Sequence, residues 1–379
     1  MKIVLAGSGT GGHFYPLIAI AEAVHDLARE QRLIAPQLIH MAPKAFDEEA
    51  LFENQISFVS IPAGKMRRYF SLQNVSDLFV TFIGFLMALV NLLRLYPDVV
   101  VSKGGYTSVP VVAAAHLLGI PVIIHESDVK AGRANLFAAP FAQRIAITFD
   151  ETASSFPAKL RSRIARTGIP IRKAIAHPET EGAREELGLD TSVPTVLILG
   201  GSSGAKRIND MIVETLPELT QVANIIHQTG KDNFAEVGTM SKLTLEKSTS
   251  PSRYYPFPFL NTLSMRRSAG AADLVISRAG TTTIAEIALW RKPSIIIPIP
   301  ETISHDQRTN AYAYAHTGAA IVLEEGNLTP HLFVSEVKRL LGDRALLASM
   351  ADKSASFGGA DAARIIAQEA LTICLSHEK

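Results

Sequence analysis

Cysteine is almost absent from the sequence, which has only Cys374 among its 379 residues. This excludes a disulfide framework and a cysteine-based zinc site, and it favours a reducing compartment such as the cytosol. A charge excess of either sign is missing too, because 37 Lys and Arg residues balance 36 Asp and Glu residues. The overall electrostatics therefore give no reason to expect a nucleic-acid partner.

Most apolar residues fall into short β-branched segments that alternate with helix-length amphipathic segments, a pattern typical of parallel sheets with helical crossovers. In the first half, strands are predicted at Lys2–Ala6, Gln37–Met41, Ser57–Ile61, Asp98–Ser102, Pro121–His125 and Arg144–Thr148. The pattern then starts again, with strands predicted at Thr195–Leu199, Asn224–Gln228, Asp273–Ser277, Ser294–Pro298 and Ala320–Leu323. We therefore expect an α/β protein with two doubly wound, Rossmann-like domains.

The boundary between these domains is predicted at the segment 167–172, where Gly168 loosens the backbone and Pro170 disfavours helix in the residue before it. The expected domains are residues 1–167 and 168–358. A last helix is predicted over Ala360–Leu375, and it need not belong to the domain that precedes it.

One segment departs from this pattern, because Leu78–Leu95 carries no charge before Arg94 and is apolar on nearly every face. Three interpretations are open: a helix buried in the core, a helix lying on a membrane surface, or a membrane span. A span is disfavoured, because the segment is slightly short of about 20 residues and lies between two strands of one sheet. The preceding Lys65, Arg67 and Arg68, with Tyr69 and Phe70, favour contact with an anionic membrane surface. The side chains expected to enter it are Phe79, Phe82, Ile83 and Leu86.

Four glycines lie between Gly7 and Gly12, directly after the first predicted strand and before His13. Such density is explained if a ligand approaches the main chain where a Cβ atom would collide. The spacing also fits the dinucleotide-binding fingerprint, but the carboxylate that this fingerprint needs is missing from the end of the second strand, at His40–Pro43. A tight turn without a ligand is the remaining alternative. His13 would project at the carboxyl ends of the strands, where chemistry is common, although a capping or packing role is its simpler explanation.

Two further strand-end loops belong to the same edge of the first sheet. Lys103–Ser108 contains a glycine pair and follows the fourth strand, and His125–Asn135 follows the fifth. Ionisable groups in two of the three loops could act as acid or base. We therefore expect an acceptor substrate among these loops.

The second domain also has a glycine-rich loop directly after its first predicted strand, at Gly200–Arg207. Backbone N–H groups at a helix start, with hydroxyls and two cations, suit a phosphate, but the spacing is not that of a Walker A loop. A second turn, Ser277–Glu286, places hydroxyls at a helix start and ends with a carboxylate. Glu286 could accept both protons of a vicinal diol, or it could simply be an acid favoured by the helix dipole. The segment Ser304–Asn310 is dense in hydrogen-bonding groups that fit sugar hydroxyls.

Together these strings resemble the MurG-type lipid-linked N-acetylglucosaminyltransferases of peptidoglycan synthesis along nearly the whole chain. The resemblance rests on GSGTGGHFYPL, SKGGYTSVP, IPVIIHES, GGSSGAKRIND, SRAGTTTIAEIALWRKPSIIIPIP and SHDQRTNA, in this order. It implies the GT-B architecture, with a lipid-linked acceptor on the N-terminal domain and UDP-N-acetylglucosamine on the C-terminal domain. It also implies that residues 359–379 form a helix that crosses back to the first domain.

The resemblance further implies roles for single residues. The catalytic base is expected to be His13 or Asp128, which share the role. The acceptor set is Gly11, Gly12, Gly104, Gly105, Tyr106, Glu126 and Asn135. The set for the nucleotide sugar is Thr10, Gly12, Arg172, Gly201, Ser202, Ser203, Gly204, Leu260, Gly280, Thr281, Glu286, Asp306, Gln307 and Asn310.

The sequence departs from the family pattern at three places. Ser127-Asp128 stands where many relatives have Gln-Asn, so that a carboxylate replaces an amide. Ser203 stands where glutamine is common, and Ala279 stands where serine is common, which weakens any role for those two side chains.

The reaction implied is an inverting transfer to the muramoyl sugar of an undecaprenyl-pyrophosphoryl-linked muramoyl-pentapeptide. No Asp-x-Asp triplet occurs in the sequence, so we expect no protein-bound metal or cofactor. Helix N-termini behind Gly204 and Gly280, with Lys206 or Arg172, would stabilise the departing diphosphate. The expected location is the cytoplasmic face of the plasma membrane, with a place in a cell-wall synthesis complex. The alternatives are a glycolipid glycosyltransferase of the same fold and a non-catalytic nucleotide-sugar-binding subunit.

Overall fold

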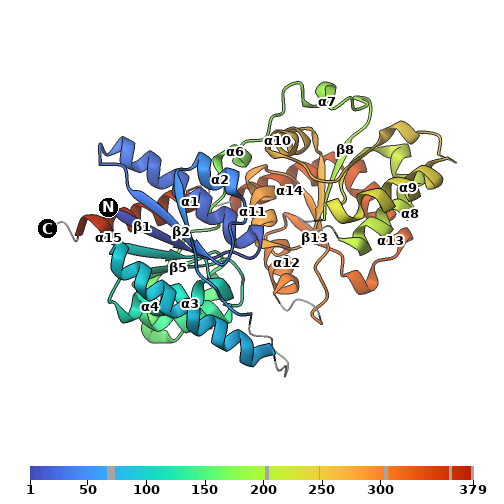
Figure 1. The fold of residues 1–379 in the computed structure, drawn as a ribbon. Coiled ribbons are helices and arrows are strands. Elements are labelled where there is room, and N and C mark those ends of the chain that lie inside the picture. The colour runs from blue at the N-terminus through green and yellow to red at the C-terminus, as the bar shows by residue number, and fades with distance from the viewer. Residues whose placement is uncertain (66–72, 201–204, 247, 303–305, 358–360, 377–379) are drawn as a thin grey trace. The chain divides into compact units, whose positions relative to one another are not determined.

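The computed structural model describes the chain apart from residues 66–72, 201–204, 247, 303–305, 358–360 and 377–379. Its two compact units are Met1–Lys173 with Ala360–Lys379, and Ala174–Gly359. Each unit contains one parallel sheet with helices on its faces (Figure 1), and the predicted α/β class is confirmed. The first boundary lies at Lys173 and not at residue 167, so the segment from Gly168 to Arg172 belongs to the first unit.

The first unit is built on a seven-stranded sheet in the order β3-β2-β1-β4-β5-β6-β7. Its strands are β1 (Lys2–Ala6), β2 (Gln37–Ala42), β3 (Ile56–Ser60), β4 (Val99–Ser102), β5 (Val122–Glu126), β6 (Arg144–Ile147) and β7 (Ile164–Arg166). All neighbours pair in parallel. The strand order reverses between β1 and β4, which is the point where open α/β sheets bind ligands.

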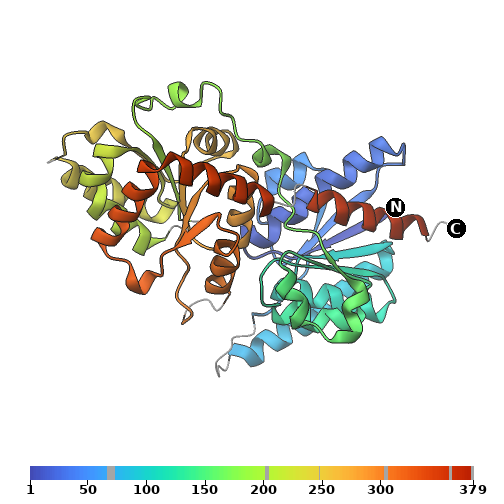
Figure 2. The same cartoon turned by 180° about the vertical axis from the view of Figure 1, so that it is seen from behind.

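Helices cover both faces of this sheet. They are α1 (Gly11–Glu30), α2 (Glu48–Glu53), α3 (Gln73–Leu95), α4 (Val109–Leu117), α5 (Arg133–Ala138) and α15 (Ala362–Ser376). On β1, Ile3 and Leu5 pack with α1 and α15, whereas Val4 and Ala6 pack with α3 and α4 on the opposite face. The C-terminal helix α15 lies beside α1 (Figures 1 and 2), and Arg364 on α15 pairs with Glu30 on α1 at 2.5 Å.

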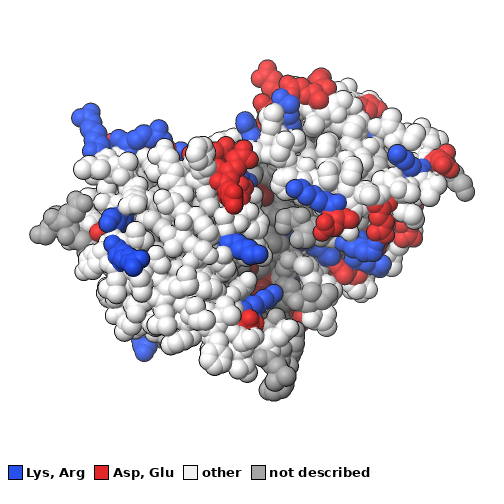
Figure 3. Space-filling view, in the orientation of Figure 1, with Lys and Arg blue, Asp and Glu red and all other residues white. Residues whose placement is uncertain are grey.

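The apolar helix α3 is mostly exposed, so a helix buried in the core is the wrong interpretation. It meets the core through Gly84, Ala88 and Leu92, which form one stripe at helical spacing. An added Cβ atom at Gly84 would overlap the carbonyl oxygen of Pro62, which shows how closely this stripe packs. The opposite face is uncovered, and the surface over α3 shows few charged side chains in Figure 3. The predicted membrane residues are exposed to 65% (Phe79), 57% (Phe82), 53% (Ile83) and 45% (Leu86).

The second unit has a six-stranded parallel sheet in the order β10-β9-β8-β11-β12-β13. Its strands are β8 (Thr195–Leu199), β9 (Asn224–Gln228), β10 (Tyr254–Phe257), β11 (Leu274–Ser277), β12 (Ser294–Ile296) and β13 (Ala320–Val322). The helices from the unit boundary onward are α6 (Lys173–Ala176), α7 (Ala183–Glu186), α8 (Lys206–Val222), α9 (Phe234–Leu245), α10 (Thr262–Ala271), α11 (Thr281–Leu289), α12 (Gln307–Ala315), α13 (Pro330–Gly342) and α14 (Arg344–Phe357). The strand order reverses between β8 and β11, so this unit has its own ligand-binding point.

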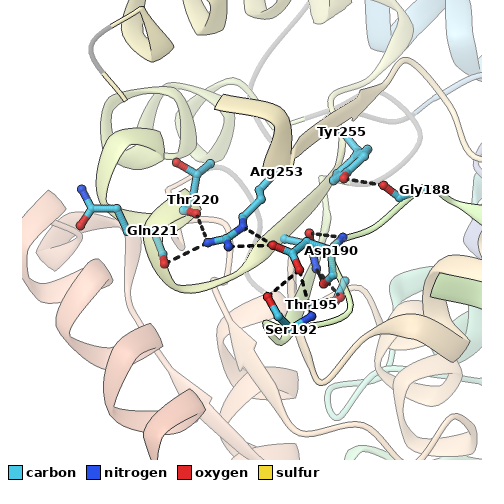
Figure 4. Close-up of polar contacts among 9 residues, drawn as sticks. Gly188, Asp190, Ser192, Thr195, Thr220, Gln221, Arg253 and Tyr255 are labelled. Atoms are coloured by element: carbon cyan, nitrogen blue, oxygen red, sulfur yellow. Dashed lines mark hydrogen bonds and ion pairs between the residues drawn. The ribbon is translucent and has the colours of Figure 1, made fainter. Parts of the chain in front are cut away.

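Arg253 holds the segment that precedes β8 in place through hydrogen bonds to Asp190 (Figure 4). Its Nε and Nη2 atoms donate to Asp190 at 3.0 and 2.7 Å, while Nη1 donates to the carbonyl oxygens of Thr220 and Gln221, both at 3.1 Å. Bonds from the hydroxyl and backbone N–H of Ser192, followed by those from Arg253, lower the pKa of Asp190 to about 2. The cluster lies at the amino end of β8 and β10, so we assign it a structural role.

Candidate functional site

Two glycine loops of the first unit touch each other at the reversal of strand order. Gly7 (φ +133°) and Gly9 (φ +102°) adopt backbone conformations that favour glycine. The Thr107 hydroxyl accepts a bond from the backbone N–H of Ser8 at 2.8 Å and donates to the Ser8 carbonyl oxygen at 3.1 Å. A Cβ atom at Gly9 would lie 3.8 Å from the ring of Tyr106, which belongs to the second loop. The loops after β1 and β4 therefore form one surface.

His13 lies in the first turn of α1, half-buried and against the second loop. A Cβ atom at Gly105 would lie 3.3 Å from Cδ2 and Nε2 of the imidazole. Burial, with a further contribution from the positive charge of Lys103, lowers the pKa of His13 from 6.5 to about 4. The imidazole is therefore neutral at physiological pH and keeps one nitrogen lone pair.

The Thr10 hydroxyl is the hydrogen-bond partner of one of the two imidazole nitrogens. Thr10 Oγ1 and His13 Nδ1 are 2.8 Å apart. When Nδ1–H donates to the hydroxyl, Nε2 is left as an acceptor next to Gly105, and a substrate hydroxyl could give its proton to it. Thr10 was predicted to contact the nucleotide sugar. In the structure its hydroxyl contacts the imidazole of His13.

Glu126, predicted to bind the acceptor, uses its carboxylate to shape the loop after β5. Oε1 accepts from the backbone N–H of Asp128 at 3.0 Å. Oε2 accepts from the N–H of Gly132 at 2.8 Å and from Nδ2 of Asn135 at 2.9 Å. We therefore assign Glu126 a positioning role, which differs from direct acceptor binding.

Asn135 joins this loop to the glycine pair after β4. Its Nδ2 also donates to the carbonyl oxygen of His125 at 3.1 Å, whereas the buried Oδ1 has no hydrogen-bond partner among the described residues. A Cβ atom at Gly104 would lie 2.8 Å from both polar atoms of the amide. Gly104, Gly105, Tyr106 and Asn135 are thus grouped with His13 in the first unit, as the sequence predicted.

Lys103 also belongs to this site, although no role was predicted for it from its position in the loop after the fourth strand. Its side chain is buried, with 2% of the residue exposed, and Nζ donates to the Ser127 hydroxyl at 2.9 Å. Burial lowers the pKa of Lys103, and the charges of Glu126 and Asp128 oppose this shift. The signal in the sequence was a lysine directly between a buried strand and a glycine pair.

Arg172 was predicted on the nucleotide side, and the structure places it in the first unit. Its guanidinium lies 3.9 Å from the centroid of the Tyr15 ring, near the start of α1. The next residue, Lys173, donates its backbone N–H to Glu22 at 2.9 Å, and its ammonium pairs with Asp26. These contacts hold the end of the first unit against α1.

In the second unit, the predicted phosphate loop, Gly201, Ser202, Ser203 and Gly204, lies outside the described residues. Helix α8 follows it, and Lys206 there pairs with Glu236 at 2.7 Å. Gly280 is the N-cap of α11, which places Thr281 in the first turn and the half-buried Glu286 one turn further. Leu260 is buried, and its backbone N–H donates to Oε1 of Gln228 at 3.0 Å.

The last predicted group stands at the start of α12. Asp306 is its N-cap residue, Gln307 its first residue, and Asn310 is buried in the first turn. Oε1 of Gln307 accepts from the backbone N–H of Ile299, in the loop that follows β12, at 3.2 Å. This contact places the start of α12 at the carboxyl edge of the sheet.

Two side chains of the second unit, the half-buried Arg278 and the buried His227, brace these loops and were not predicted. Arg278 pairs with Glu325 at 2.5 Å and donates to the carbonyl oxygens of Ile297 and Pro298 at 3.2 and 3.3 Å. His227 lies 3.0 Å through Nε2 from Oδ1 of Asn209, in the first turns of α8. Burial lowers the pKa of His227 to about 3, so it stays neutral.

Among the described residues, no group of three or more His, Cys, Asp or Glu side chains is arranged to hold a metal ion.

Gly105→Ala is expected to lower kcat about tenfold, because the new Cβ atom would displace the His13 ring. Gly119→Ala is the control, since Gly119 also has a positive φ (+69° against +77°) but nothing within 4 Å of an added Cβ atom. Both variants should lose unfolding free energy, and Gly105→Ala should lose more, because Gly105 (φ +77°, ψ 162°) has a backbone conformation that is essentially restricted to glycine. Steady-state kinetics and denaturant unfolding measure the two effects. Equal kcat values for the two variants would contradict the placement of His13.

Two Rossmann-like parallel sheets, each with a reversal of strand order, define the GT-B fold, and the family models give the class as a glycosyltransferase. The glycosyltransferase family 28 N-terminal domain matches residues 3–147, and the C-terminal domain of the same family matches residues 195–366. The crystal structure of Acinetobacter baumannii MurG superposes with a TM-score of 0.73 at 26% identity, covering 98% of this chain and 99% of that chain.

Curated relatives identify the particular group of glycosyltransferases to which the chain is similar. The UDP-N-acetylglucosamine–N-acetylmuramyl-(pentapeptide) pyrophosphoryl-undecaprenol N-acetylglucosamine transferase of Treponema denticola is 35% identical over 376 residues, 96% of each chain. The enzyme of the same name from Clostridium kluyveri is 35% identical and covers 89% of this chain and 91% of its own. The chain belongs to this family of transferases, and the resemblance seen in the sequence is confirmed.

Proposed function

We propose that the chain transfers N-acetylglucosamine from UDP-N-acetylglucosamine to the muramoyl sugar of an undecaprenyl-pyrophosphoryl-linked muramoyl-pentapeptide. Family membership supports this reaction. The observation that carries its chemistry is the neutral, half-buried His13 at the strand reversal of the first sheet. Such a group can take the proton of an attacking hydroxyl.

The step is an inverting displacement. The acceptor hydroxyl oxygen forms a bond to the anomeric carbon, the bond from that carbon to the diphosphate oxygen breaks, and UDP leaves with the electron pair. The hydroxyl proton passes to Nε2 of His13, while the Thr10 hydroxyl holds Nδ1–H. No other proton transfer is required to form the products.

Uncapped helix starts supply positive potential for phosphate groups. The N-cap positions of α1, α8 and α11 are Thr10, Ala205 and Gly280, none of which makes a side-chain cap bond, and none of these helices has an acid in its first turn. By contrast, Asp47 caps α2 and Asn261 caps α10. Free N–H groups at a helix start bind anions, so we propose that those of α8 and α11 stabilise the leaving diphosphate without a protein-bound metal.

A UDP-release assay with a panel of acceptors tests this function. We expect release with polyprenyl-diphosphate-linked muramoyl-pentapeptides and none with plain glycolipids. Turnover of glycolipids alone would favour the alternative acceptor class. Binding of UDP-N-acetylglucosamine without UDP release in the presence of any lipid acceptor would instead favour a non-catalytic subunit.

Glu286→Gln is expected to raise the KM for UDP-N-acetylglucosamine about 10- to 100-fold, because a carboxylate can accept two charge-assisted bonds from the ribose diol and an amide oxygen accepts them less strongly. Glu214→Gln, on the exposed face of α8 in the same unit, is the control and should leave the KM unchanged. The measurement is initial-rate kinetics at saturating acceptor. An unchanged KM in Glu286→Gln would remove the ribose assignment.

We also propose that α3 lies on an anionic membrane, which would place the protein at the cytoplasmic face of the plasma membrane. Among the described residues, α3 is long and apolar enough to cross a bilayer by length and composition alone. A crossing would pull apart β3 and β4, which flank α3 in the chain and belong to one sheet. Its exposed apolar face instead suits an interfacial helix. Of the preceding basic and aromatic residues, Arg67, Arg68, Tyr69 and Phe70 lie outside the described residues. A cell-wall synthesis complex stays a prediction.

A further inference from the structure

Lys103 is a buried cation at the meeting point of the three loops of the first unit. Its backbone N–H donates to the carbonyl oxygen of Ala6 at 2.9 Å, and its Cβ atom lies close to Gly7. Its ammonium reaches Ser127 on the third loop, at 2.9 Å. An ammonium with 2% of its residue exposed needs negative charge nearby, because an uncompensated buried charge is costly.

Two carboxylates can compensate this charge, and they differ in how they are held. Glu126 accepts bonds from three N–H groups of its own loop, which engage both of its oxygens. Asp128 is fixed through its backbone, since its N–H donates to Glu126 at 3.0 Å and its carbonyl oxygen accepts from the Thr152 hydroxyl at 2.9 Å. This anchoring keeps Asp128 next to Ser127, the residue that accepts the Lys103 bond.

We propose that Lys103 and Asp128 form a charge-compensated pair that positions the third loop, and that His13 alone takes the proton. Asp128 is then a positioning residue and not the base. The inference rests on the proposed function for the identity of the reaction, but the pair itself does not depend on it. It also explains both departures of the loop from the family pattern, because the Ser127 hydroxyl accepts the Lys103 bond and Asp128 adds a negative charge that acts on Lys103 together with that of Glu126.

The pair affects the charge balance around His13. Apart from the exposed Lys130 and Arg133, the ionisable groups of the surrounding elements are Lys103 and Tyr106 after β4, His125, Glu126 and Asp128 at the end of β5, and His40 on β2. His125 and His40 donate their Nε2–H groups to the carbonyl oxygens of Gly168 (2.8 Å) and Gly7 (2.9 Å), and burial lowers the pKa of both. With these histidines neutral, Lys103, Glu126 and Asp128 are the charged side chains of this group.

A double-mutant cycle tests the pair. Asp128→Asn alone should lower kcat/KM for the acceptor at least about tenfold, because Lys103 loses part of its compensation. In a Lys103→Met background, the same substitution should change kcat/KM less than about threefold. Lys130→Met, an exposed lysine of the same loop, is the matched control and should leave kcat/KM unchanged. Equal losses from Asp128→Asn in both backgrounds would overturn the proposal, as would no loss in the wild-type background.

Two further measurements test the Lys103–Asp128 pair. The first distinguishes it from a general loss of structure, and the second tests it independently of the proposed function. Asp128→Asn should regain activity as the pH rises, because burial already lowers the pKa of Lys103, and loss of a carboxylate lowers it further until the uncompensated charge disappears. The recovery should be absent in the Lys103→Met background, which has no ammonium to lose its proton, whereas recovery in both backgrounds would point to a missing base. Thermal unfolding of the four proteins should show the same non-additivity without any substrate. If no acceptor is turned over, the proposed function fails, while the unfolding data still decide on the pair.

Discussion

His13→Gln is expected to lower kcat about 10²- to 10⁴-fold, which is the usual contribution of a general base. Glutamine keeps a polar side chain of similar reach but cannot take a proton near neutral pH. The KM for UDP-N-acetylglucosamine should change little, because in this account His13 acts on the acceptor hydroxyl. Steady-state UDP release, with each substrate varied in turn, measures both constants.

The control is His331→Gln, which makes the same change at an exposed position at the start of α13. It should leave kcat unchanged. Near-normal turnover of His13→Gln, together with loss of turnover in Asp128→Asn in both Lys103 backgrounds, would transfer the base to Asp128. That result would contradict both the mechanism and the further inference.

Replacement of Phe79, Phe82 and Leu86 by serine is expected to weaken binding to anionic vesicles at least about 100-fold. Each of these side chains is at least 45% exposed, and burial of such a side chain in an apolar phase contributes about 1.5–3 kcal/mol when complete. Because they point away from the core, the melting temperature should stay nearly constant. Co-sedimentation with vesicles containing phosphatidylglycerol, and thermal unfolding, measure the two quantities.

The matched control replaces Ile34 and Phe52 by serine, since these side chains are 86% and 85% exposed elsewhere on the first unit. Vesicle binding should be unaffected by that change. A folded α3 variant that still binds vesicles as the wild type does would refute the membrane role of this helix. Turnover of a water-soluble acceptor analogue should survive the α3 substitutions, because the glycine loops are not altered.

The central strands could be predicted from the sequence because strands buried on both faces appear as short, nearly continuous apolar runs. Two strands were missed, and both lie at sheet edges. β7 has three residues and ends in Arg166, while β10 contains Pro256 and is only half-buried. Edge strands pack on fewer neighbours, so their sequences carry a weaker pattern.

The grouping of the site loops could also be predicted, because parallel strands bring their carboxyl ends to one edge. The positions of Lys103 and Arg278 in their loops were visible, but their burial and their partners were not. Ser127 and Glu325 lie 24 and 47 positions further along the chain, and only the fold brings them into contact. For α3 the uniform apolar composition could not separate core from membrane, and the exposure of its side chains settles that it is not a core helix.

The most direct test of the mechanism is the pH dependence of kcat/KM for the lipid acceptor, measured by UDP release. This constant reports the ionisation of the free enzyme, and the reaction requires an unprotonated His13. Since the pKa of His13 is lowered to about 4, we predict a plateau through neutral pH and a half-maximal value near pH 4. A decline centred near 6.5, the ordinary value for histidine, would contradict the account.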